Sequence, residues 1–269
     1  MKEIFPFVNM TWNTRKLKDK WVPILQDINH GDLETQFEMI KRGYRQANSY
    51  GFTTPRFDEE MIWLSERGLI ALPIHRTQLH KGYDHRFYMK NKIDMETYVY
   101  SAVSDTYDSA KQFKDHHLLP DGTDHKEVGA MLGYPDCCVE KFLGHWPTKA
   151  DPTWDLAAGS DGAEVAENTV HITGNKKLNN LARAFGFKVC GYYVGDYNCP
   201  EAIKFADKWI ECMESYVDSE SMEMLLELLD SPMTWSMKNG IIEVRTEAFR
   251  GATNGYFTDE KKVIYWNQP

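Results

Sequence analysis

Cysteine is scarce in this sequence, with five residues in a chain of 269. A low and odd number excludes the disulfide framework of a small secreted domain and indicates a reducing compartment, the cytoplasm. Long apolar runs are missing too. No stretch reaches the roughly 18 apolar residues of a membrane span, and the opening MKEIFPFVNMTWNTRK lacks the apolar core of a secretory signal peptide. We therefore expect a soluble cytoplasmic protein with no membrane partner.

The sequence also lacks an excess of positive charge. The formal net charge is −9 and the sequence pI is about 5.5, which excludes a broad surface for duplex nucleic acid. Three motifs are absent as well: the G-x-S-x-G of serine hydrolases, the Walker A loop and the dinucleotide-binding G-x-G-x-x-G. The expected partner is a small-molecule substrate, and the pattern leaves the oligomeric state open.

Helical and strand-like patterns alternate along the chain, which predicts a mixed α/β (α+β) fold with helices packed on a small mixed sheet. The expected helices are residues 33–49, 58–68, 105–117, 124–133, 175–186, 199–217 and 219–231. The expected strands are residues 69–75, 187–195, 240–247 and 261–266. We expect an N-terminal α/β region, 1–95, and a cysteine-motif domain, 96–269, or one continuous globular unit formed by both.

Two adjacent cysteines stand out in HKEVGAMLGYPDCCVEKF, residues 125–142. Proline fixes its own φ and keeps the preceding residue extended, so Tyr134-Pro135 should form a rigid turn that delivers Cys137 and Cys138 to a helix start. The unpaired N–H groups of a helix N-terminus favour a thiolate. We therefore expect the pKa of this vicinal pair to be lowered.

Two further cysteines lie in comparable places. Cys190 ends an expected strand, and Cys199 directly precedes a proline at the start of an expected helix. Together with Cys138, or with Cys137, these thiols would hold zinc or an iron–sulfur cluster, with one position open for substrate. Cys212 lies inside an amphipathic helix and is expected to pack as a small apolar residue. The alternative is a set of buried thiols with one reactive cysteine.

The histidines offer one candidate near the cysteines. His125, one helix upstream, could be a metal ligand, a general base or an activator of a thiol. The five-residue spacing of His75, His80 and His85 matches neither a helix face nor a strand face, so a polar, exposed loop is expected there. The pair at residues 116 and 117 is expected at the surface.

The stretch GAMLGYPDCCVEKF resembles the signature of an uncharacterised prokaryotic and phage domain family, G-x-L-L-G-Y-P-x-C-C-x-x-x-F. The stretches YVYSAV, DPTWDLA, NKKLNNLARAFGFKV and VCGYYVGDYNCPEA are similar to other parts of that family. SPMTWSMKNGIIEVRTEAF resembles its W-S-x-x-H-G-I-x-E-V-x-T-P block, and the resemblance covers about residues 98–249. The sequence departs from the family at Asn239, where a histidine is expected, and in the eight residues that separate Cys190 from Cys199.

The resemblance points to cysteines as the site but carries no established reaction. The residues in the similar blocks that could bind substrate are Tyr134, Trp154, Asn179, Arg183 and Trp235. We expect an enzyme, of a class that the sequence does not define, that uses a cysteine-ligated metal or iron–sulfur centre on a small-molecule or nucleotide-like substrate. Its catalytic residues would be His125, Cys137 and Glu243. The alternatives are a metal-free enzyme with Cys138 or Cys137 as nucleophile and His125 as base, and a non-enzymatic binding module with a structural zinc.

Overall fold

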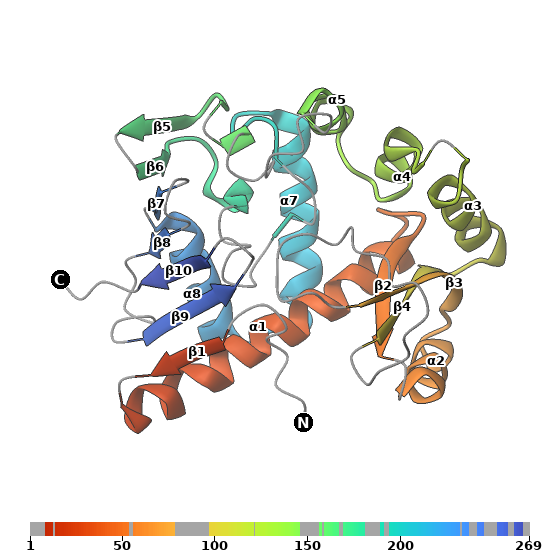
Figure 1. Cartoon of the computed structure of the whole chain (residues 1–269), viewed down its shortest axis with the longest axis horizontal. Coiled ribbons are helices and arrows are strands. Elements are labelled where there is room, and N and C mark those ends of the chain that lie inside the picture. The colour runs from red at the N-terminus through yellow and green to blue at the C-terminus, as the bar shows by residue number, and fades with distance from the viewer. Residues whose placement is uncertain are drawn as a thin grey trace. The chain divides into compact units, whose positions relative to one another are not determined.

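The computed structural model describes most of the chain between residues 9 and 265 (Figure 1). The described residues are 9–12, 14–53, 56–78, 97–120, 122–145, 156–157, 159–166, 169–180, 189–190, 194–231, 233–236, 241–244, 252–257 and 261–265. Of β1 and of the strands after residue 231, the backbone alone is described.

Seven α-helices, one 3-10 helix and ten strands lie within these residues. The helices are α1 (Arg15–Lys41), α2 (Phe57–Glu66), α3 (Tyr107–His117), α4 (His125–Met131), α5 (Asp136–His145), η3 (Lys176–Leu178), α7 (Pro200–Met213) and α8 (Ser219–Asp230). The strands are β1 (Asn9–Trp12), β2 (Asn48–Thr53), β3 (Ile70–Gln78), β4 (Thr97–Ser104), β5 (Ala163–Ala166), β6 (Thr169–Ile172), β7 (Met233–Ser236), β8 (Ile241–Val244), β9 (Ala252–Phe257) and β10 (Lys261–Tyr265).

The chain divides into two compact units. One, which we call the discontinuous unit, consists of Met1–Thr35 and Cys137–Pro269. The other, the inserted unit, is the continuous stretch Gln36–Asp136 between them. Helix α1 runs from the first unit into the second, and the return crossing lies in the first turn of α5.

The discontinuous unit contains a seven-stranded sheet in the order β1-β9-β10-β8-β7-β6-β5. Its neighbouring strands are antiparallel, except that β10 and β8 run parallel, with Ile264 opposite Ile242. Figure 1 shows β8, β9 and β10 side by side. The sheet is therefore mixed, as the sequence predicted.

Helices α7 and α8 supply a large part of the described core of the discontinuous unit. Their apolar residues recur every three or four positions, which places them on one face of each helix. Trp209, Met213 and Leu225 are fully buried, and each such side chain contributes about 2–3 kcal/mol through burial. Helix α1 packs closely against the α7–α8 connection at Gly31. A Cβ atom added to Gly31 would lie only 1.9 Å from Val217 Cγ2. A glycine is therefore required at this helix contact.

The inserted unit is built on an antiparallel sheet in the order β2-β4-β3. Helix α3 contacts β3, β4 and α4. Each of the two helices begins at a side-chain cap: Thr106 Oγ1 accepts from Ser109 N, and Asp124 Oδ1 accepts from Glu127 N. The buried residues of this core are Ala47, Ala102, Ala110, Phe113, Val128, Met131 and Leu132.

The predicted fold class is confirmed: the chain is mixed α/β, with helices on small sheets. Several local predictions need correction. The helix predicted over residues 33–49 ends at Lys41, and residues 48 and 49 belong to β2. The described part of the predicted helix 175–186 contains the short 3-10 helix η3 rather than an α-helix. His75 lies in β3 rather than in an exposed loop, and Nε2 of His117 is buried. The first helix begins at Arg15 rather than near residue 33; Pro23, which lacks an N–H and normally ends a helix, lies inside it. Residues 189, 190, 194 and 195 are not in a strand, so Cys190 does not end one. The expected division between residues 95 and 96 lies outside the described residues.

Among the described helices, none combines the length and the hydropathy that a bilayer crossing requires.

Candidate thiol site

The Gly-Tyr-Pro sequence before the vicinal cysteines is a helix C-terminus. Gly133 has φ +70°, its N–H donates to Ala130 O at 2.9 Å, and Tyr134 N–H donates to Gly129 O at 3.0 Å. This pair of hydrogen bonds is the Schellman arrangement, which requires a left-handed residue at its centre. A Cβ on Gly133 would also lie 2.3 Å from Tyr44 O. Glycine is therefore needed at this position for two independent reasons.

The turn leads directly into α5. Pro135 follows the Schellman turn and cannot continue α4, and α5 begins at the next residue, Asp136. Cys137 and Cys138 therefore lie in the first turn of α5, as the sequence predicted. The rigid turn and the helix start are both confirmed.

The central contact of the site joins residues far apart in the chain. Cys137 Sγ lies 2.9 Å from Cys199 Sγ, and Cys137 Sγ lies 4.0 Å from Cys138 Sγ. Cys199 is the N-cap residue of α7, followed by Pro200 at the first helical position. Cys137 and Cys199 are each partly exposed, whereas Cys138 and Cys190 are each 2% exposed. The partly exposed pair is thus the one that solvent can reach.

Cys138 and Cys190 complete what we call the thiol cluster, Cys137, Cys138, Cys190 and Cys199. The charges of Cys199 and Cys190 both act on Cys138. Cys212, by contrast, is fully buried among the apolar residues of α7, which confirms its predicted role as a packing residue. Four of the five cysteines therefore gather in the discontinuous unit, and the fifth belongs to its core.

The backbone at Gly195 is held next to Cys138. Lys141 Nζ donates to Gly195 O at 2.5 Å, and Ser160 Oγ donates to the same oxygen at 3.1 Å. Hydrogen bonding from the Gly195 amide lowers the pKa of Cys138. Lys141 follows Cys137 by four residues on α5, so both project from the same side of the helix. Lys141 and Ser160 therefore fix the position of the amide that contacts the Cys138 thiol.

The vicinal thiols have raised pKa values, which corrects the expectation of lowered ones. Burial raises the pKa of Cys137 far above its usual range, and the hydrogen bond with Cys199 raises it further. Burial also raises the pKa of Cys138, to about 11, against the opposing effect of the Gly195 amide. Desolvation penalises the charged form of a thiol, and here it outweighs the dipole of α5. Both thiols are therefore protonated at neutral pH.

A buried phenol lies next to the thiol cluster. Tyr197 is fully buried, and its hydroxyl donates to Asn180 Oδ1 at 2.7 Å. Burial, followed by the charge of Cys190, raises the pKa of Tyr197 well above its usual range. Tyr197 is therefore a neutral hydrogen-bond donor that fixes the side chain of Asn180.

The donor chemistry of the thiol cluster suits a thiophilic metal, but its geometry does not present a ready site. Among the residues that the structure describes, no three His, Cys, Asp or Glu side chains are arranged so that they could hold an ion. Tetrahedral zinc needs its ligand atoms at about 2.0–2.3 Å. The described arrangement is thus one close pair of sulfurs with two further thiols nearby.

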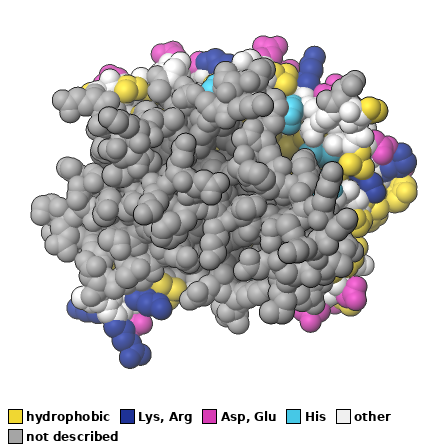
Figure 2. Space-filling view, in the orientation of Figure 1, with side chains coloured by type: hydrophobic (Ala, Val, Ile, Leu, Met, Phe, Trp, Pro, Cys, Tyr) yellow, Lys and Arg dark blue, Asp and Glu magenta, His cyan; other side chains and the backbone are white. Residues whose placement is uncertain are grey.

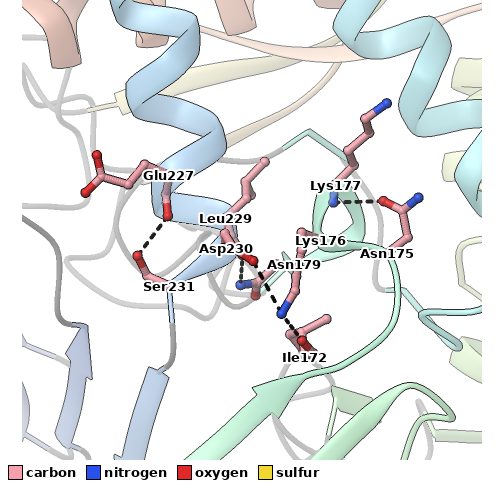
Figure 3. Close-up of polar contacts among 9 residues, drawn as sticks. All are labelled: Ile172, Asn175, Lys176, Lys177, Asn179, Glu227, Leu229, Asp230 and Ser231. Atoms are coloured by element: carbon pink, nitrogen blue, oxygen red, sulfur yellow. Dashed lines mark hydrogen bonds and ion pairs between the residues drawn. The ribbon is translucent and has the colours of Figure 1, made fainter.

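Asn179, expected to bind substrate, takes part in the packing of α8 (Figure 3). Its Nδ2 donates to Leu229 O at 2.6 Å, and the residue is 2% exposed. Leu229 lies in the last turn of α8, where carbonyl groups lack helical partners. Nearby, Lys176 Nζ lies 3.4 Å from Asp230 Oδ1. The amide nitrogen of Asn179 is therefore engaged by a helix end.

The remaining expected residues are distributed over the chain. Glu243 lies on β8, opposite Thr234 of β7 and Tyr265 of β10, so its strand is interior to the sheet. Trp235 lies on β7 opposite Ile242. Three further residues lie outside the described part of the chain: Trp154, Arg183 and Asn239.

His125 and Tyr134 belong to the inserted unit. His125 is the first residue of α4, and burial lowers its pKa. Tyr134 packs against the core of that unit, with the Arg45 guanidinium 5.5 Å from its ring centre.

Sequence reasoning missed Lys141, Ser160, Gly195 and Tyr197. Only Lys141 carried a signal, its spacing of four residues from Cys137 on a predicted helix.

Comparison with known proteins found no protein-family model, no curated protein and no solved structure that matches this chain.

Proposed function

We propose that the protein is a thiol enzyme in which Cys137 and Cys199 form a redox-active pair that exchanges with a disulfide substrate. The observation that carries the proposal is the 2.9 Å separation of their Sγ atoms. A disulfide bond is about 2.0 Å long, so a small side-chain movement would close the pair. Both residues are partly exposed, which gives a substrate access to either sulfur.

The exchange has two steps. The thiolate of Cys199 attacks one sulfur of the substrate disulfide, and the other substrate sulfur leaves and takes up a proton. Cys137 then loses its proton to solvent and attacks Cys199, which expels the second substrate sulfur. Two protein thiols are oxidised to one disulfide, and one substrate disulfide is reduced to two thiols. The second step should be slow at neutral pH, because burial raises the pKa of Cys137.

The fixed residues around the pair would set its geometry. Lys141 and Ser160 hold Gly195 beside Cys138, and the α4–α5 turn holds the start of α5. The substrate in this proposal is a small-molecule disulfide. His125 and Glu243 take no part in either step of the exchange.

The test is oxidation of the reduced full-length chain with a small disulfide, oxidised glutathione, followed by peptide mapping. A disulfide between Cys137 and Cys199 is expected, with release of two equivalents of reduced glutathione. Cys137→Ser and Cys199→Ser should each abolish it, whereas Cys212→Ser serves as the matched control. Failure to form any disulfide within the thiol cluster would contradict the proposal.

A second candidate is the thiophilic metal or iron–sulfur centre, with zinc as the simplest occupant. It is supported by the gathering of four thiols. When ionised, Cys190 and Cys199 repel the thiolate of Cys138 and raise its pKa. A bound cation would relieve this repulsion between thiolates. The side chains would have to move to enclose an ion. Metal analysis of anaerobically purified protein separates the candidates: stoichiometric metal, with thiols that alkylate only after chelation, favours the second.

A further inference from the structure

Four histidines of the inserted unit come from three neighbouring elements. His75 lies on β3, His116 and His117 end α3, and His125 begins α4. We call these four the imidazole cluster. Histidine side chains (cyan) are visible on the face shown in Figure 2 in the region of α4. Because α3 contacts β3, β4 and α4, these imidazoles lie where the helices meet the sheet.

His117 is at the centre of the imidazole cluster and is packed among rings. Its ring centre lies 4.8 Å from that of Phe113 and 5.7 Å from that of Tyr100, the latter edge-on at 79°. Tyr100 in turn stacks on His75 at 5.0 Å and 22°. His117 Nε2 is buried, with no hydrogen-bond partner in the part of the chain that the structure describes. A proton added there would have no acceptor and little water.

The neighbouring charges do not offer His117 a counter-ion. On α3, His116 Nδ1 lies 3.7 Å from Asp124 Oδ2, and Asp115 pairs with Lys111. Burial lowers the pKa of His125, and the charge of Asp124 opposes this lowering only in part. The other titratable side chains that the structure describes on these elements are Tyr100 of β4, His75 of β3, Tyr107, Asp108 and Lys114 of α3, and His125, Lys126 and Glu127 of α4. The groups whose charges act on His117 are His75, His125 and His116, all of which become positive in acid.

We propose that the imidazole cluster makes the inserted unit acid-sensitive, so that protonation releases α3 and α4 from β3 and β4. The helices are held by the apolar core that Phe113 and Val128 share, and His117 lies one turn beyond Phe113 on α3. A charged His117 would need a partner or water at Nε2, which is buried in the described structure. Movement of α3 away from the sheet would expose this atom to water. The device is independent of the thiol cluster.

The direction of the pH effect follows from linkage. Burial, and then the charges of His75, His125 and His116, lower the pKa of His117 from 6.5 to about 4. Burial also lowers the pKa of His75 and of His125. Above about pH 6.5 the imidazole of His117 is mostly neutral in the closed and open states alike. Between that pH and about 4 the open state binds a proton at His117 that the closed state does not, and the lowered pKa values of His75 and His125 act in the same direction. Acid therefore favours opening, by up to about tenfold per pH unit for each of these histidines.

The test is hydrogen exchange of the full-length chain between pH 7 and pH 5, read by mass spectrometry of peptides and corrected for intrinsic exchange rates. Protection of residues 107–131 should fall by at least about tenfold. His117→Phe keeps an aromatic ring against Phe113 but binds no proton, so it should remove most of the fall. His171→Gln, at an exposed histidine on β6, is the matched control and should leave the fall unchanged.

Unchanged protection of residues 107–131 in the wild-type chain would overturn the proposal, as would an equal fall in His117→Phe. If His117→Phe is already unprotected at pH 7, His75→Phe and His125→Gln decide the question. A smaller acid-dependent fall in either variant supports the imidazole cluster, and a full-sized fall in both overturns it.

Discussion

Cys137 Sγ and Cys199 Sγ lie 2.9 Å apart, although these cysteines are 62 positions apart in the sequence. The contact joins the first turn of α5 to the N-cap of α7. Each sulfur is placed by a proline: Pro135 ends the turn before α5, and Pro200 opens α7. Two locally determined helix starts thus meet in the folded protein.

Alkylation of the vicinal thiols should accelerate steadily with pH. Thiolate is the reactive species, and burial raises the pKa of Cys137, the partly exposed member of the pair, far above its usual range. Its thiolate fraction, and hence its labelling rate with iodoacetamide, should rise by about tenfold per pH unit between pH 7 and pH 9. Peptide-resolved mass spectrometry measures this rate, with buried Cys212 as the unlabelled reference. A plateau near pH 8 would mean that the thiolate is stabilised by a group not recognised in this site.

Cys212→Ala should lower the free energy of unfolding by about 1–2 kcal/mol, because it leaves a small cavity in the fully buried face of α7. Denaturant unfolding followed by circular dichroism measures the change. The oxidation of Cys137 and Cys199 by a small disulfide should be unaffected. Loss of that oxidation in a folded Cys212→Ala protein would show that the wrong cysteine was placed outside the thiol cluster.

Gly133→Ala should be strongly destabilising, by about 2 kcal/mol or more, since it combines an unfavourable positive φ with a Cβ only 2.3 Å from Tyr44 O. Gly144→Ala is the matched control on α5. A Cβ there meets nothing within 4 Å, and alanine favours the helix by up to about 1 kcal/mol. Thermal unfolding of both variants checks the contrast, and equal stabilities would refute the strict need for glycine in the turn.

Lys141→Met should remove the ammonium that holds Gly195 O and cost about 1 kcal/mol. Because the Gly195 amide opposes the rise of the Cys138 pKa that burial causes, the thiolate fraction of Cys138 at a fixed pH, measured by its ultraviolet absorbance, should also fall. Lys141→Arg retains a charged donor and should recover part of both losses. Lys204→Met, which breaks only an exposed pair with Glu201, should change neither quantity measurably.

The sequence predicted those parts of the fold that depend on local chemistry. Asp124 as a cap, Pro200 at a helix start and the apolar stripes of α7 and α8 are readable from spacing alone, and each is confirmed. Helix α1 was predicted over residues 33–49 from the spacing of its apolar residues, whereas it spans Arg15–Lys41 with Pro23 inside it. A proline is locally unfavourable in a helix interior, so this part of the helix cannot be read from local preference.

The site was predictable in composition but not in geometry. The sequence identified the four gathered thiols, yet the contacts of Lys141 with Gly195 and of Cys137 with Cys199 span 54 and 62 residues. No local pattern encodes such pairings. The sign of the pKa shift at the vicinal pair was also missed, because it depends on how deeply the fold buries the thiols, and the helix dipole alone argues for the opposite sign.

The interrupted course of the discontinuous unit has a consequence for the order of folding during synthesis. The inserted unit, Gln36–Asp136, is one continuous stretch and can complete its core as soon as it leaves the ribosome. Strand β1 must instead wait for β9, since Asn9 pairs with Gly255. During the early part of that interval, Cys137 and Cys138 have been made but Cys199 has not. The nascent chain therefore carries two adjacent thiols before their eventual neighbour exists, and a reducing environment would protect them from pairing with the wrong partner.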